Sequence, residues 1–169
     1  MTPDHARMMA RYNSWQNDRL LAAADTLDDE GRWADHGAFF TSIAQTLNHL
    51  LWDDAVWLAR MTGDADGAAK LDKDFPYTET PRDWSLYRAK RQEVDASLTQ
   101  WAVMLTDDDL AGGRTWRMGG EPVETTVAVM AAQLFNHQTH HRGQVHAMLT
   151  AAGAKTAPTD VMVMCLTEA

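Results

Sequence analysis

The chain has 169 residues, of which 45% are hydrophobic, and this length favours a single domain over residues 1–169 with a well-buried core. The formal net charge is −9 and the acidic residues are spread along the chain, which argues against nucleic acid as a partner. There is no apolar run of about 18 residues, no secretory-signal pattern and only one cysteine, so we expect a cytoplasmic protein that does not contact a membrane.

Two long helices are predicted in the first part of the chain. Residues 3–26 and residues 39–61 both have apolar side chains at the spacing of amphipathic helices. The second helix is expected to end before Gly63. Residues 63–77 are rich in Asp and Gly, and we expect them to form a long linker.

A third helix is predicted from a start signal around Thr80. This residue is expected to be the N-cap, with Pro81 at the first helical position and Asp83 three residues after the cap. The stripe that follows is apolar except at Arg91 and consists of Trp84, Tyr87, Arg91, Val94, Leu98, Trp101 and Leu105. We expect Arg91 to pair with Asp54 of the second helix or to extend to solvent, and substrate binding is a further alternative.

The last part of the chain contains a glycine-rich segment, a fourth helix and an apolar tail. Paired glycines in residues 112–122 indicate a small β-hairpin or an extended crossover. The fourth helix is expected over residues 124–152, and residues 158–166 are apolar enough to pack back, with Cys165 as a packing residue. These elements predict an all-α fold, a four-helix bundle with at least one long crossover connection.

Two histidines interrupt the apolar stripe of the fourth helix. His137 and His141 are four residues apart, hence about 40° apart around a helix. The stripe is apolar at its other positions, which are Val127, Met130, Leu134, Val145, Met148 and Ala152. Two imidazoles on one buried face can bind one metal ion, although a pair of buried histidines held by hydrogen bonds is the alternative. His140 lies off this stripe.

A third ligand would have to come from another helix. The second helix offers His49, but this residue lies off the main apolar stripe, so periodicity leaves two interpretations open, a metal ligand or a surface or hydrogen-bonded histidine. The remaining histidines, His5, His36 and His146, have no comparable spacing and are expected to be exposed or paired locally.

The chain resembles the DinB/YfiT-like metalloproteins over nearly its whole length. The resemblance rests on residues 12–20, on residues 47–51 with Trp57, Arg60 and Gly63, and most specifically on LFNHQTHHRGQ at residues 134–144. In this family a divalent ion, commonly zinc or nickel, is held by one histidine of the second helix and an H-x-x-x-H pair of the fourth. The resemblance therefore implies His49, His137 and His141 as ligands, and it also suggests a homodimer.

Three neighbours of these histidines are candidates for supporting roles. Gln144 lies three residues after His141 and could hydrogen-bond a ligand ring or a water on the metal. Asp53 lies one turn after His49 and could orient it, although an Asp on a helix is more often solvated. Gly143 is expected to let a neighbouring helix approach closely.

An open three-histidine site is typical of catalytic rather than structural zinc. The first hypothesis is therefore a metal-dependent enzyme. Some relatives are thiol-dependent transferases or isomerases, which implies a low-molecular-weight thiol and a small electrophile as partners, and metal-assisted hydrolysis is a variant. The catalytic group itself is not identified beyond a water or thiol on the metal.

The alternative is a non-catalytic, metal-binding homodimeric module. A ferritin-like di-iron site is excluded because no Glu-x-x-His motif is present.

Overall fold

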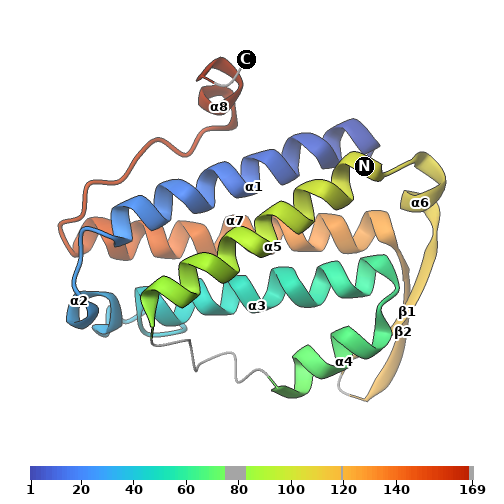
Figure 1. The fold of residues 1–169 in the computed structure, drawn as a ribbon, viewed down its shortest axis with the longest axis horizontal. Coiled ribbons are helices and arrows are strands. Elements are labelled where there is room, and N and C mark those ends of the chain that lie inside the picture. The colour runs from blue at the N-terminus through green and yellow to red at the C-terminus, as the bar shows by residue number, and fades with distance from the viewer. Residues whose placement is uncertain (75–82, 119, 168–169) are drawn as a thin grey trace.

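Four long helices lie alongside one another in the computed structural model, which describes residues 1–74, 83–118 and 120–167 (Figure 1). They are α1 (Pro3–Ala24), α3 (Ile43–Thr62), α5 (Trp84–Met104) and α7 (Val127–Ala151). The smaller elements are α2 (Asp29–Trp33), α4 (Ala65–Asp74), α6 (Asp107–Ala111), β1 (Gly113–Met118), β2 (Glu121–Thr126) and α8 (Val161–Thr167). Helix α3 packs against α7, and α1 packs against α5. The predicted four-helix bundle with a small hairpin is confirmed.

Side-chain caps set where several of these helices begin. Thr2 accepts a hydrogen bond from the backbone N–H of His5, and Pro3 follows at the first helical position. Ser42 caps α3 and Thr126 caps α7 in the same way. At the other end of α3, Gly63 has φ of +82°, a left-handed conformation that glycine adopts without strain and that ends the helix.

The structure places the starts of α3 and α5 later in the chain than the sequence predicted. Helix α3 begins at Ile43 rather than at residue 39, because Thr41 has φ of +59°, which is incompatible with a right-handed helix, and Ser42 follows as the cap. Helix α5 begins at Trp84 with Asp83 as its N-cap, because the Asp83 carboxylate accepts from the N–H of Leu86. The predicted cap Thr80 and the predicted first residue Pro81 lie outside the described residues.

The connections also differ from the sequence-based expectation. Residues 65–74 form α4 instead of a linker, and the Asp64 carboxylate accepts from the N–H of Gly67 in its first turn. Helix α7 begins at Val127 rather than at Glu124, because Glu124 pairs with Thr115 in the antiparallel hairpin. The path from α3 to α5 therefore passes through α4, which lies beside the hairpin at one end of the bundle (Figure 1).

The interior of the bundle has two apolar clusters with polar side chains between them. One cluster contains Trp57, Met61, Leu98, Met130 and Leu134, and the other contains Leu20, Ile43, Leu47, Val145 and Leu149. Between these levels on the four long helices lie buried polar residues that we call the central polar layer: Asn13, Asn17, Asp54, Arg91, Asp95, Gln138 and Arg142. Every long helix contributes to this layer, so it ties the bundle together at mid-height.

The ion pairs of Arg91 are the centre of this layer. Its side chain is only 1% exposed, and Nη2 lies 2.8 Å from Oδ2 of Asp54 and 2.9 Å from Oδ1 of Asp95. Asn13 donates to Asp54 at 3.2 Å, and Asn17 donates to Asp95 at 2.9 Å. Of the expected alternatives for Arg91, pairing with Asp54 is the one found.

The C-terminal segment packs back onto α1, as expected from its apolar residues. The hydroxyl of Tyr12 and the amide of Gln16 both donate to the carbonyl oxygen of Thr159, at 2.5 and 2.8 Å. On α8, Met164 is fully buried, whereas Cys165 is exposed, because the next residue along a helix points about 100° away. The expectation that Cys165 is a packing residue was wrong. Among the described residues, no helix has both the length and the apolar character to span a membrane.

Candidate metal centre

Three histidines from two helices converge in the middle of the bundle. His49 comes from α3, and His137 and His141 come from successive turns of α7 on the side that faces α3. One ring nitrogen from each lies within 4.8 Å of the other two, and Nε2 of His49 is 3.1 Å from Nε2 of His137. The structure thus brings together all three histidines named from the sequence. We call them the histidine cluster.

Burial keeps two of the three histidines uncharged. His49 and His141 are buried, and His137 is partly exposed. Loss of solvation, with the nearby His137 ring as a second cause, lowers the pKa of His49 to about 4. Burial likewise lowers the pKa of His141. These two imidazoles are therefore neutral near pH 7, the form that offers a nitrogen lone pair to a metal.

Asp53 lies against His137 rather than against His49, the neighbour suggested by the sequence. Its Oδ2 atom is 2.9 Å from Nδ1 of His137, although the angles are not those of a hydrogen bond. The other oxygen, Oδ1, accepts a 3.0 Å hydrogen bond from the indole N–H of Trp57, one turn further along α3. Trp57 therefore fixes the carboxylate beside His137.

Gln144 contacts the third histidine of the cluster. Its Oε1 atom is 2.6 Å from Nδ1 of His141. An amide oxygen can only accept, so this contact favours the tautomer of His141 with the proton on Nδ1 and the lone pair on Nε2. Gly143, one position earlier, is exposed and has no atom within 4 Å of the place where a Cβ would be, so the expected close helix approach was wrong.

An aromatic wall on one side of the cluster was not predicted from the sequence. Phe40 stacks on His49, with 4.1 Å between ring centroids and 28° between planes, and its ring centroid is 5.3 Å from that of His141. Phe40 is 9% exposed whereas the adjacent Phe39 is 81% exposed. The left-handed backbone at Thr41 turns the chain between Phe40 and α3. The sequence feature that could have indicated this contact is the pair of phenylalanines just before the N-cap of α3.

Arg91 does not belong to the cluster. It is buried in the central polar layer, where Asp54 and Asp95 neutralise it. The layer nevertheless adjoins the cluster, because Asp54 follows Asp53 in α3 and Gln138 follows His137 in α7. Gln138 donates to Asp54 and, at 3.1 Å, to the carbonyl oxygen of Leu50. These bonds join α3 and α7 next to the histidines.

The cluster fits a divalent metal ion by its donors and by its size. Nitrogen atoms bonded at about 2.0–2.1 Å to a tetrahedral ion are roughly 3.4 Å apart, so the separations of up to 4.8 Å are within reach of modest side-chain rotation. Neutral imidazoles suit zinc, nickel, copper and iron. The three histidines could therefore bind a metal ion.

Comparisons with known proteins agree with this architecture. The chain is 24% identical over 162 residues to Protein DinB of Bacillus subtilis strain 168, a match that covers 93% of this chain and 91% of that protein. The fold is similar to a crystal structure of a DinB-like protein from Bacillus cereus ATCC 10987, with a TM-score of 0.62, 21% identity and coverage of 85% of this chain and 89% of that one. It is also similar to a DinB-like protein from Bacillus subtilis, with a TM-score of 0.63, 14% identity and coverage of 89% and 95%. The family model described as DinB family matches residues 2–167, and the chain belongs to this family.

Proposed function

We propose that the histidine cluster holds a divalent ion, zinc or nickel, and that the protein is a metal-dependent enzyme. The observation that carries this proposal is a donor set of three imidazoles, two of them made neutral by burial. The one cysteine, Cys165, is exposed on α8 and is no candidate for a fourth ligand. A bound ion would retain its positive charge in such a site and would acidify a nearby thiol or water or polarise a carbonyl group.

The surrounding side chains have definable roles in such an enzyme. Asp53 is placed to hold His137 in one orientation, and Gln144 is placed to fix the tautomer of His141. Phe40 covers the ring of His49 and excludes water from that side. His137 is the most exposed of the three histidines, so a substrate would approach beside it.

The reaction we favour is transfer of a low-molecular-weight thiol to a small electrophile, or a related isomerisation. This choice rests on the family resemblance, in which some members are thiol-dependent enzymes. Hydrolysis of a small substrate at the same site is the variant. Both reactions need a deprotonated thiol or water near neutral pH. A cationic site supplies this nucleophile by lowering the pKa of the thiol or water.

A turnover assay tests this proposal. The purified chain, loaded with zinc or nickel, is mixed with a small electrophile such as 1-chloro-2,4-dinitrobenzene and with a series of thiols. We expect metal-dependent turnover that is lost in His137→Ala and kept in His140→Ala, a matched change at the exposed histidine outside the cluster. Equal turnover in the two variants, with both folded by circular dichroism, would contradict the proposal.

The second candidate is a non-catalytic homodimeric module in which the ion is structural or regulatory. It is favoured by large apolar side chains on the surface, among them Met104 at 70%, Val129 at 57% and Leu166 at 78% exposure, which a second copy could cover. Sedimentation with and without a chelator separates the two candidates. A dimer that dissociates or unfolds on metal removal, without turnover under any condition, would support the module.

A further inference from the structure

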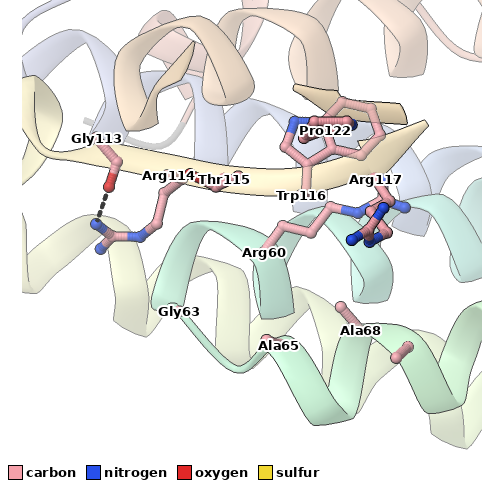
Figure 2. Close-up of a pocket in the computed structure, with 11 residues that line it drawn as sticks. Arg60, Gly63, Ala65, Ala68, Gly113, Arg114, Thr115, Trp116, Arg117 and Pro122 are labelled. Carbon is pink, nitrogen blue, oxygen red and sulfur yellow. Dashed lines mark hydrogen bonds between the residues drawn. The ribbon is translucent and has the colours of Figure 1, made fainter. Parts of the chain in front are cut away.

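A cleft of about 510 Å³ lies at the hairpin end of the bundle, apart from the histidine cluster (Figure 2). It is lined by the end of α3, the first turns of α4 and both strands of the hairpin. Its volume is within the range of sites that hold small molecules.

The cleft is positively charged in an otherwise acidic protein. Three of its lining residues are arginines, Arg60, Arg114 and Arg117, and none of the described lining residues is acidic. The whole chain has a net charge of −9 with only 15 Lys and Arg residues, so three in one cleft is a marked concentration. A hollow lined by one sign of charge attracts counter-ions of the opposite sign.

Neighbouring groups hold these arginines in place. The Arg60 guanidinium lies 4.9 Å from the ring centroid of Trp57 and 4.3 Å from that of Trp116. Arg114 donates from Nε to the carbonyl oxygen of Met61 at 3.1 Å and from Nη1 to that of Gly113 at 2.9 Å. Arg117 donates from Nη1 to the carbonyl oxygen of Gly120 at 2.7 Å. Figure 2 shows Arg60 and Arg117 extending towards the same end of the cleft. Because a guanidinium has five N–H donors, these bonds use only part of the capacity of Arg114 and Arg117.

The remaining walls are apolar. Ala65, Ala68 and Ala69 line the α4 side, and Trp116 and Pro122 belong to the hairpin. We propose that this cleft binds a small organic carboxylate with an apolar body. Arg117, at the end of the cleft that it shares with Arg60, would take the carboxylate, for which its planar fork is suited, and the alanines and Trp116 would cover the apolar part. The proposal is independent of the metal site, because the cleft and the histidine cluster share no residue.

Calorimetric titration with octanoate tests this proposal, with octanamide and inorganic phosphate as comparison ligands. We expect octanoate to bind, octanamide to bind about tenfold more weakly because it lacks the charge, and phosphate to bind more weakly because it lacks the apolar body. Octanoate binding should also weaken as NaCl is raised.

Arg117→Gln is the diagnostic variant, because Arg117 is exposed and its loss leaves the interior unchanged. It should weaken octanoate binding about tenfold, whereas Arg11→Gln, a matched change of an exposed arginine on α1, should not. Arg60 is unsuitable as a test, because it packs on Trp57, which holds Asp53 of the metal site. No octanoate binding by the wild type, equal binding of octanamide or phosphate, or equal weakening in both variants would overturn the proposal.

Discussion

Asp53 is the side chain on which the orientation of His137 depends. Replacing it by Asn keeps the size and the acceptor for Trp57 but removes the charge next to Nδ1 of His137. Because partners of ligand histidines contribute to metal binding, we expect Asp53→Asn to weaken zinc affinity about 10- to 100-fold. Competition with a coloured chelator measures the change, and Asp66→Asn, at an exposed position on α4, is the control. Equal affinities in the two variants would show that Asp53 does not act on His137.

The lowered pKa of His49 predicts how stability changes with pH in the metal-free protein. Between pH 6.5, the ordinary histidine pKa, and pH 4, the unfolded chain binds a proton at His49 that the folded chain does not bind. The free energy of unfolding therefore falls as the pH falls through this range. Urea unfolding at pH 7.5 and pH 5 should show a loss about 1 kcal/mol larger for the wild type than for His49→Gln. If His49→Gln lost as much unfolding free energy as the wild type between pH 7.5 and pH 5, the pKa of His49 would not be lowered in the fold.

At the scale of the elements, the central polar layer connects the long helices. Arg91→Met leaves the buried Asp54 and Asp95 without their cation, and we expect a loss of about 3–5 kcal/mol in the free energy of unfolding. Arg88→Met removes a partly exposed pair with Asp25 from the same helix and should cost less than about 1 kcal/mol. Urea unfolding of both variants measures the difference. Similar losses of unfolding free energy in the two variants would mean that water reaches the central polar layer.

The elements that could be predicted were those with a long apolar period. All four long helices were found in this way, because their stripes face a common core. The hairpin was one of two alternatives that the paired glycines indicated. Helix α4 was missed because its residues are mostly Ala, Asp, Gly and Lys, and its helical state depends on packing against α3. The start of α7 was misplaced because Glu124, Thr125 and Thr126 include no glycine or proline to mark a boundary, and their pairing with β1 decides the structure.

The candidate site was predictable only in part, for a similar reason. His137 and His141 stand out because they occupy positions of a core stripe, which is a local property. His49 lies off its stripe, and only the family resemblance identified it. The contacts of Asp53 with His137 and of Phe40 with His49 join different elements, so no spacing within one helix indicates them. The roles of these residues in metal binding stay predictions.

At the scale of the whole molecule, polar and apolar levels alternate along the bundle. Apolar clusters fill both ends, and the polar layer and the histidine cluster occupy the middle. Residues of α4 and the hairpin line the proposed carboxylate cleft, and these elements lie together at one end of the bundle (Figure 1). This division lets the ends carry most of the apolar burial while the middle holds groups that are costly to bury.

Metal content per chain tests the central claim most directly. The wild type, His49→Ala and His140→Ala are each incubated with zinc or nickel, passed through a desalting column and analysed for metal by mass spectrometry. We predict one ion per folded chain in the wild type and in His140→Ala, and a loss of bound metal in His49→Ala. A folded His49→Ala that keeps the full metal content, or a wild type that retains none, would contradict the assignment of the histidine cluster as a metal site.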